Sequence, residues 1–497
     1  MPNQTPNIDI LYEKCMTLGT KERISARAIY NYCVSPFMVH CDKFAPKEKM
    51  DPITLYDRLL FEQGKEHESK VIEKIYPEAE KLIFTTREEG FKMLLGEMQK
   101  GSAGFCGIPA FYLPEGLEGV FDVIEKRGTH PSIFGDYHYV VKEIKLAKNI
   151  QKHHIEQAAF YNYMLGKIQG YTSTEFHIIN RDLEEIPFRY DEEELLQILE
   201  DIRAIMHGKE VNPTRGACIW PWQSYNDEEA EKRRDISLSC GIGPAFKHKL
   251  NSAGIITIDD LAKTPEGSLL SIKGIGGKMA RKFSLSAKAL VSGKHIMLGN
   301  CEFPKKSVEV FLDLEGTGEQ VRDEELVAID YLIGVLVRKN GHLEYKPFLA
   351  HGFDKEGDMV REFLAWLKKQ HDFIIYHWHH YESTHLRKLA ERHGLSEAEK
   401  NLILENMRDL YKDAVSNFAF PTCGNGLKEI AAYMGHKWRH PDVDALESIA
   451  FYFLYVQDPK KHKEEIQKVI DYNEDDCRAT VVVKDWLFNE SKKQTNE

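Results

Sequence analysis

The sequence predicts an α/β protein that is divided into several domains. Its 497 residues exceed what a single hydrophobic core usually organises. Two distant regions, one around residues 117–146 and one after residue 301, alternate apolar and polar residues as β-strands do. A glycine-punctuated helical stretch lies between them. We therefore expect an α/β domain, a small all-α segment and a second α/β domain, at residues 1–225, 226–300 and 301–497.

Composition and charge narrow the class of protein. An apolar fraction of 42% and a charged fraction of 29% are typical of a globular domain protein. No apolar run is long enough to cross a bilayer, and the first residues lack a signal pattern, so we expect a cytoplasmic protein without a membrane partner. Its nine cysteines should then be mostly reduced. The net charge of −12 argues against nucleic-acid binding over the whole surface but not against a local basic groove.

The first strand-rich region places acids and a lysine on neighbouring strands. Asp122 lies in the run GVFDVI, and a turn-rich stretch leads from it to the strand YVVKEIKLA. The two-residue period of that strand puts Glu143 and Lys145 on one face. The next stretch is helical, and Gln157 and Tyr161, four residues apart, share a face of that helix.

This set of side chains is typical of a metal-dependent hydrolase of phosphodiesters. Carboxylate oxygens are the ligands that Mg²⁺ prefers, and a bound cation lowers the pKa of water and neutralises phosphate charge. A lysine beside them can orient the nucleophile or stabilise developing charge. The competing interpretation is an exposed strand with alternating charges beside a tyrosine of the core.

The pattern D…E-x-K followed by Q-x-x-x-Y resembles the RecB-like branch of the PD-(D/E)xK nucleases. The resemblance implies a restriction-endonuclease-like fold over residues 1–225. It implies that Asp122 and Glu143 hold a metal ion and that Lys145, Gln157 and Tyr161 complete the catalytic site.

The same family usually takes one more ligand from an upstream helix, four residues after a glycine. Gly64 in FEQGKEHESKV points to Glu68, with His67 beside it. The family more often has histidine at this position, so the choice between His67 and Glu68 stays open, and Glu68 is the predicted ligand.

Some RecB-like nucleases also hold an iron–sulfur cluster on four cysteines. Here only Cys218 lies in the corresponding region, and upstream only Cys33 and Cys41 are at hand. Three thiolates are too few for the usual ligand set, so we expect no cluster. Trp220, Trp222 and Tyr225 are expected to fill that space as core.

A charged stretch at 226–234, NDEEAEKRR, is the predicted linker, and a segment with two glycine turns follows it. The turns are GIG at 241–243 and GIGG at 274–277, each before a helical run. The segment resembles the helix-hairpin-helix DNA-binding family, in which glycines let backbone N–H groups approach a phosphate at a helix N-terminus. The resemblance implies DNA contacts by Lys273, Gly274, Gly276, Gly277, Lys278 and Arg281. The competing interpretation is a helical spacer between two nuclease domains.

The last region contains a second set of acids. The strand VEVFLDLEGTGE places Asp313 and Glu315 on one face. A turn at Asn340-Gly341 should join two further strands. Downstream, Glu382 follows the strand FIIYH, and Tyr472 and Asp476 form a Y-x-x-x-D pattern in a helical run.

These motifs resemble the DEDD exonucleases of the ribonuclease H-like fold, in the branch with the YprB-like domain. The resemblance implies that Asp313, Glu315, Glu382 and Asp476 hold two cations and that Tyr472 positions the attacking water. Asp475 is a rival for Asp476. The neighbouring histidines could suggest zinc, although core or surface roles are favoured; they are His377, His379, His380 and His385.

Together these features predict a deoxyribonuclease dependent on Mg²⁺ or Mn²⁺, acting on single strands or ends in repair, recombination or defence. A ribonuclease remains an alternative, because the last fold handles RNA as well as DNA. A non-catalytic DNA-binding adaptor with vestigial metal sites is another. The sequence has no G-x-x-x-x-G-K-[ST] loop, so a helicase partner would be a separate chain.

Overall fold

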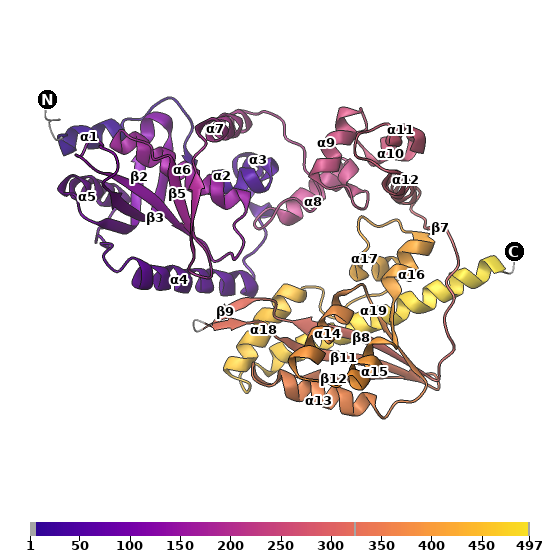
Figure 1. Cartoon of the computed structure of the whole chain (residues 1–497). Coiled ribbons are helices and arrows are strands. Elements are labelled where there is room, and N and C mark those ends of the chain that lie inside the picture. Colours follow the sequence, from indigo (N-terminus) through magenta and orange to yellow (C-terminus); the bar gives the residue numbers. More distant parts are fainter. Residues whose placement is uncertain (1–5, 323–324, 496–497) are drawn as a thin grey trace. The chain divides into compact units, whose positions relative to one another are not determined.

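The structure is a computed structural model that describes residues 6–322 and 325–495. The chain forms two compact units. Unit 1 comprises Met1–Pro52 and Leu60–Glu229, and unit 2 comprises Ile53–Leu59 and Ala230–Glu497. Figure 1 labels the helices and many of the strands of each unit.

Unit 1 is built on a mixed six-stranded sheet. Its path runs β2-β3-β4-β5-β6, and β1 adds a short parallel pairing to β3. The β3–β4 pair is antiparallel, which confirms the predicted hairpin, and β4 then pairs parallel with β5. The strands are β1 (Ile24–Ser25), β2 (Gly104–Tyr112), β3 (Leu117–Arg127), β4 (His138–Ile144), β5 (Glu175–Ile179) and β6 (Glu185–Arg189).

Helices surround this sheet, and α6 follows β4 directly. Every residue of β4 is buried, and α6 is buried around most of its circumference, so both lie in the core of unit 1. The helices are α1 (Ile8–Met16), α2 (Ala26–Val34), α3 (Pro36–Phe44), α4 (Leu55–Ile75), α5 (Arg87–Lys100), α6 (Lys152–Gln169), α7 (Glu192–Met206) and α8 (Gln223–Lys232).

The charged stretch expected to be a linker is helical. Residues 226–232 belong to α8, and the division between the units falls inside that helix at Glu229. Glutamate, alanine and lysine are good helix formers, so a polar composition alone did not distinguish a solvated helix from an irregular linker.

The all-α part of unit 2 contains the same type of glycine turn at two positions. Gly241 and Gly274 have φ of +89° and +87°, and the N-caps Gly243 and Gly276 are both extended. Ile242 and Ile275, one in each turn, are buried in a shared small core. The helices are α9 (Pro244–Ser252), α10 (Ile258–Lys263), α11 (Glu266–Leu270) and α12 (Gly277–Ser292).

The rest of unit 2 is a five-stranded sheet in the order β12-β11-β8-β13-β14. β11 pairs antiparallel with both β8 and β12, whereas β13 pairs parallel with β8 and β14 pairs parallel with β13. Asn340 and Gly341 both have positive φ, of 52° and 81°, which confirms the predicted two-residue turn. The strands are β8 (Val308–Gly316), β11 (Asp330–Lys339), β12 (His342–Leu349), β13 (Phe373–His377) and β14 (Met407–Asp409).

Two ribbons and seven helices complete unit 2. Pairing of β7 with β15 ties the chain after α12 to the second half of the unit. The ribbons are β7 (Ile296–Met297) with β15 (Phe418–Ala419), and β9 (Gln320–Arg322) with β10 (Glu325–Val327). The helices are α13 (Glu356–Leu367), α14 (Tyr381–Arg392), α15 (Glu397–Leu404), α16 (Leu410–Asn417), α17 (Leu427–Tyr433), α18 (Ala445–Gln457) and α19 (Lys463–Thr495).

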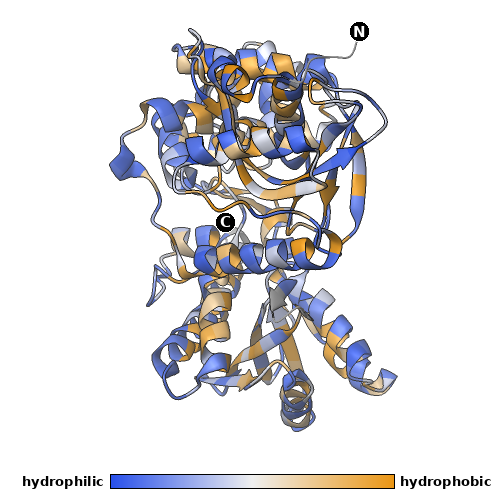
Figure 2. Cartoon of the chain, turned by 90° about the vertical axis from the view of Figure 1, so that its left-hand side faces the viewer, coloured by the Kyte–Doolittle hydropathy of each residue, from blue (hydrophilic) through white to orange (hydrophobic). Residues whose placement is uncertain are grey.

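Hydrophilic and hydrophobic residues interchange along most helices, as Figure 2 shows. This is the pattern of helices that bury one face and expose the other. No helix in the described part of the chain is both long and apolar enough to span a bilayer.

Candidate metal and catalytic sites

Three carboxylates meet in unit 2, and they come from two distant parts of the sequence. Asp313 and Glu315 project from β8, and Asp476 projects from α19. One oxygen of each lies within 4.8 Å of the others, and this is the one such triplet of potential metal ligands among the described residues. The alternation of β8 brings the first two together, and packing of α19 on the sheet adds the third.

Hydrogen bonds fix the orientation of two of these acids. Asn473 donates from Nδ2 to Asp313 at 2.7 Å and accepts at Oδ1 from the Tyr345 hydroxyl at 2.9 Å. The Trp438 indole N–H donates to Asp476 at 2.8 Å. Neutral donors therefore aim the carboxylates at one another without removing their charge.

Burial and mutual repulsion change the acidity of the cluster. Burial first, and then Asp476, raise the pKa of Glu315 to about 8. Burial also raises the pKa of Asp476 to about 6, against the opposing effects of Trp438 and Lys428. The pKa of Asp313 is raised by burial and by its three acidic neighbours. In the absence of a cation, the protein resists ionising all three acids together.

Tyr472 and Lys428 lie beside the acids. Burial and the neighbouring Asp476 raise the pKa of the Tyr472 phenol, so this group stays protonated and can donate or accept a hydrogen bond. The Lys428 ammonium lies 4.6 Å from the centre of the Tyr472 ring and donates to the Val443 carbonyl at 3.2 Å. Lys428 lies on α17, and the sequence motifs of the site did not include it.

Glu382 lies at the start of α14 and faces a buried histidine. Its Oε2 atom is 3.4 Å from Nδ1 of His377, and both atoms are buried without a hydrogen-bond partner in the described chain. Burial raises the pKa of Glu382, while His377 lowers it. Its charge reaches Asp313, whose pKa it raises, but its oxygens fall outside the close triplet.

The donor set in unit 2 fits a divalent cation. Clustered carboxylates, a neutral tyrosine nearby and an unpartnered Glu382 oxygen are hard oxygen donors of the kind that Mg²⁺ and Mn²⁺ take. Asp313, Glu315 and Asp476 would be the inner ligands, with Glu382 at the edge of the site.

Other acids and histidines near this site have separate partners. Asp475, the rival of Asp476, accepts hydrogen bonds from the backbone and the guanidinium of Arg439 at 2.8 and 3.0 Å. His385 pairs with Asp330 at 2.7 Å, and the ring of His379 packs on Tyr411. The histidines therefore do not converge on one point, and Asp476 rather than Asp475 faces the cluster.

The candidate site in unit 1 contains a positively charged side chain, Lys145, among its acids. Lys145 donates to Glu143 at 2.6 Å, and Asp122 accepts from the backbone N–H of Ile144 at 2.9 Å. Burial and then Asp122 raise the pKa of Glu143 well above its ordinary value. Burial acts to lower the pKa of Lys145, but Glu143 and Asp122 raise it overall. The three groups therefore interact as one cluster, in the arrangement expected from β3 and β4.

The upstream helix α4 brings both candidate ligands to this cluster. Burial and Asp122 raise the pKa of Glu68, and Lys145 lowers it, so Glu68 lies within electrostatic reach of the site. His67 is buried, and its Nε2 atom has no hydrogen-bond partner in the described chain. The geometry keeps both residues as candidates. The described carboxylates of unit 1 do not form a triplet within 4.8 Å.

Tyr161 lies against the acids and Gln157 lies one helical turn before it. Burial, followed by Glu143 and Asp122, raises the pKa of the Tyr161 phenol. Gly119 on β3 makes room for this ring, because a Cβ there would lie 2.5 Å from it. Gln157 is half-buried on α6. A bulky residue at 119 would displace the tyrosine from the site.

The cysteines considered for a cluster occupy two regions of unit 1. Cys41 and Cys218 pack with Trp222 in a small apolar cluster, and Cys33 packs against the main core. Trp222 is 2% exposed, as expected for a residue of the core.

The residues predicted to contact DNA lie around the second glycine turn. Most are exposed at the end of α11 and the start of α12, and no side chain caps the N-terminus of α12. They are Lys273, Gly274, Gly276, Gly277, Lys278 and Arg281. Lys282, on the same helix, is exposed as well.

Comparison with known proteins identifies one part of the chain. Residues 310–488 match the family model of the RNase H superfamily. No curated protein matches the chain. The matched stretch contains the five-stranded sheet, apart from the first two residues of β8, and all three clustered acids. The C-terminal part of unit 2 is therefore ribonuclease H-like, a fold that generally performs metal-dependent nuclease chemistry.

Gly334 is expected to position Asn473 for its contact with Asp313. A Cβ at Gly334 would lie 1.5 Å from Oδ1 of Asn473 and 2.9 Å from the Tyr345 hydroxyl. Gly334→Ala should therefore lower nuclease activity about 10- to 100-fold, the usual effect of losing a group that orients a metal ligand. In the Asn473→Ala background the same substitution should cost little more, measured as a double-mutant cycle. Additive losses would show that Gly334 acts elsewhere.

The raised pKa values predict that the metal-free protein loses stability as pH rises. An unfolded glutamate loses its proton near its ordinary pKa of 4.5, whereas folded Glu315 holds it to about 8. Its stabilising contribution is thus complete below 4.5 and is lost as pH rises through 8. In EDTA the melting temperature should fall across this window, and Mn²⁺ should raise it more at pH 8 than at pH 5.5.

The control for this measurement is the double variant Asp313→Asn/Glu315→Gln. It removes the titrating pair but keeps the shape of the site, so its melting temperature should depend less on pH and on Mn²⁺. Identical pH profiles in the wild type and the variant would contradict the assignment.

Proposed function

We propose that the protein is a nuclease that hydrolyses phosphodiester bonds of DNA, acting on single strands or ends and requiring Mg²⁺ or Mn²⁺. The observation that carries this proposal is the triplet Asp313, Glu315 and Asp476 within a ribonuclease H-like fold; Glu315 and Asp476 are buried and Asp313 is half-buried. No other arrangement in the described residues brings three such ligands so close. Unit 1 would supply a second, PD-(D/E)xK-type site.

In unit 2 the side chains of the protein would hold the cations and orient the groups that react. Bound cations would neutralise the scissile phosphate and lower the pKa of a coordinated water. The triplet would hold them, with Asn473 fixing Asp313 and Trp438 fixing Asp476. Tyr472 keeps its proton and would hydrogen-bond the attacking water. Lys428 supplies positive charge next to the acids, which favours an anionic substrate.

In unit 1 the lysine has the central role. Lys145 is protonated and hydrogen-bonded to Glu143, so it can stabilise the charge that develops on the phosphate. Asp122, Glu143 and Glu68 are the proposed metal ligands of this site. Tyr161 and Gln157 close it from α6.

Two equivalent glycine turns support DNA binding by the helical segment. In each, a left-handed glycine precedes an extended glycine N-cap, and the helix that follows has no side-chain cap. Free N–H groups at such a terminus bind a phosphate oxygen without reading base sequence. A pair of turns would contact a duplex or a strand at two phosphates.

A cleavage assay tests the nuclease proposal. Labelled single-stranded DNA, double-stranded DNA and RNA are incubated with Mn²⁺ and the wild type, Lys145→Ala or Asp476→Asn. We expect loss of a metal ligand in Asp476→Asn to lower cleavage by unit 2 at least about 100-fold. Lys145→Ala should lower cleavage by unit 1 about 10²- to 10³-fold. The products that persist in each variant assign the two activities.

The matched control is Asp475→Asn, which changes the neighbouring acid but leaves the triplet intact. It should keep cleavage within a few-fold of the wild type, because Asp475 is engaged by Arg439. Equal losses in the two variants would remove Asp476 from the site. Absence of cleavage on every substrate would overturn the nuclease proposal in favour of a binding protein, and cleavage of RNA alone would make the protein a ribonuclease.

The hairpin contact is tested by Gly276→Val. No atom lies within 4 Å of a Cβ built at Gly276, so the fold should accept valine while the side chain blocks the approach of a phosphate. We expect weaker binding of duplex DNA and a salt slope reduced by about 0.9 for one lost phosphate contact. Fluorescence anisotropy against salt concentration in EDTA measures both quantities.

Gly267→Val is the control for that experiment. Gly267 lies on α11 of the same segment, and a Cβ there also meets nothing within 4 Å. Binding by this variant should match the wild type. If both valine variants keep the wild-type salt slope, the helical segment is a spacer rather than a DNA contact.

A further inference from the structure

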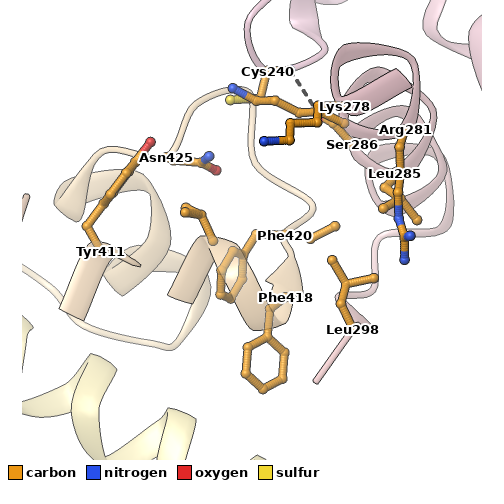
Figure 3. Close-up of a pocket in the computed structure, with 13 residues that line it drawn as sticks. Cys240, Lys278, Arg281, Leu285, Ser286, Leu298, Tyr411, Phe418, Phe420 and Asn425 are labelled. Carbon is orange, nitrogen blue, oxygen red and sulfur yellow. Dashed lines mark hydrogen bonds between the residues drawn. The ribbon is translucent and has the colours of Figure 1, made fainter. Parts of the chain in front are cut away.

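A cavity of about 280 Å³ opens in unit 2 between α12 and the segment around α16 and β15. Lys278, Arg281 and Lys282 line it from α12. Figure 3 shows α12 on one side of the cavity and the aromatic residues Tyr411 and Phe420 on the other. We call this cavity the basic cleft.

Helical spacing separates the cleft from the core of the segment. Positions 278, 281, 282 and 285 follow the i, i+3, i+4, i+7 pattern of one helix face. Ala280, Phe283 and Ala287 on another face are buried in the small core with Ile242 and Ile275. The cations are therefore presented outward by a helix that is anchored on its other side.

The cleft carries positive charge without compensation from its own walls. None of the described residues that line it is Asp or Glu, and its three cations form no ion pair in the described chain. Elsewhere in unit 2, comparable cations are paired: Arg408 with Asp413 at 2.8 Å, for example. In a chain with a net charge of −12, three unpaired cations side by side favour an anionic ligand.

The opposite wall is apolar and aromatic. Phe420 is buried in the floor, Tyr411 is half-buried, and Leu298 leaves 37% of its surface exposed. Cations that follow a phosphate backbone, combined with aromatic faces, are the usual means of holding single-stranded nucleic acid. A volume of about 280 Å³ is near the lower limit of small-molecule sites and fits a nucleotide unit rather than a folded partner.

The cleft is joined by contacts to the loop that leads to Glu382. Asp409 accepts from the backbone N–H groups of His379 and Tyr411, both at 3.0 Å, and the rings of these two residues are 4.3 Å apart. One carboxylate thus fixes the cleft wall and the chain just before α14. A nucleic-acid strand bound in the cleft would therefore lie next to the loop before α14, the helix that carries Glu382.

We propose that the basic cleft binds a nucleotide of single-stranded DNA next to the ribonuclease H-like site. Phosphates lie on Lys278, Arg281 and Lys282, and a base or sugar lies against Leu298 and Tyr411. This inference rests on the proposed nuclease function and adds to it a strand-selective contact that duplex DNA, with its bases paired and stacked, does not make.

Two matched pairs of variants test the cleft with fluorescein-labelled (dT)₁₅ in EDTA. Lys282→Gln removes a cleft cation, and Lys288→Gln removes an exposed cation of α12 that does not line the cleft. Leu298→Ser removes an apolar cleft contact, and Val291→Ser changes an exposed apolar residue of α12, also outside the cleft. All four side chains are exposed at least in part, so folding is checked by thermal melting.

We expect Lys282→Gln to weaken (dT)₁₅ binding several-fold and to lower the salt slope by about 0.7. Leu298→Ser should weaken binding by about 5-fold or more with an unchanged salt slope, because an apolar contact rather than a charge is lost. The two controls should bind like the wild type, and Leu298→Ser should bind a 15-base-pair duplex normally. Equal losses in Lys282→Gln and Lys288→Gln, or normal (dT)₁₅ binding by Leu298→Ser, would overturn the inference.

The cleavage assay separates this inference from the proposed function. Cleavage in Mn²⁺ together with cleft-independent (dT)₁₅ binding would remove the cleft and keep the nuclease. Cleft-dependent (dT)₁₅ binding without cleavage of any substrate would support the cleft as a binding site and overturn the nuclease proposal. No binding of (dT)₁₅ by the wild type would overturn the cleft directly.

Discussion

Repulsion among buried carboxylates is the constraint around which the ribonuclease H-like part is arranged. At 4 Å, two unit charges repel by about 4 kcal/mol at the effective dielectric of a protein surface, and by more in its interior. Asp313, Glu315 and Asp476 lie within 4.8 Å of one another. Only a shared proton or a cation relieves this repulsion, and burial together with Asp476 accordingly raises the pKa of Glu315 to about 8. Donors such as Asn473 and Trp438 maintain the arrangement rather than neutralising it.

In the candidate site of unit 1, a lysine side chain offsets part of the repulsion among the acids. Lys145 lies 2.6 Å from Glu143, and the Ile144 N–H holds Asp122. A lysine therefore offsets part of the negative charge that a cation alone would offset in unit 2. The two sites should differ in what metal removal does to them. Unit 1 keeps an internal counter-charge hydrogen-bonded to its acid, whereas in unit 2 the nearby Lys428 donates its hydrogen bond to the Val443 carbonyl.

Local periodicity was sufficient to predict part of each site. The alternation of β8 placed Asp313 and Glu315 on one face, and the alternation of β4 did the same for Glu143 and Lys145. Family-like motifs added Tyr161 from the helix that follows β4 and Asp476 from a helix far along the chain. Gly334, Asn473 and Trp438 were missed, because their roles follow from which strand pairs with β8 and how α19 crosses it. No short window of sequence contains that information.

Net charge is a poor guide to what the helical segment binds, and α12 shows why. One face of this helix is buried with Phe283, and another face carries the cations of the basic cleft. Its N-terminus follows the turn at Gly276. A total of −12 averages over all of these surfaces. What a phosphate meets is set within about one Debye length, roughly 8 to 10 Å at physiological salt. A protein can therefore repel nucleic acid over most of its surface and still hold it where it is cleaved. That combination also favours release of the product once the strand leaves the cleft.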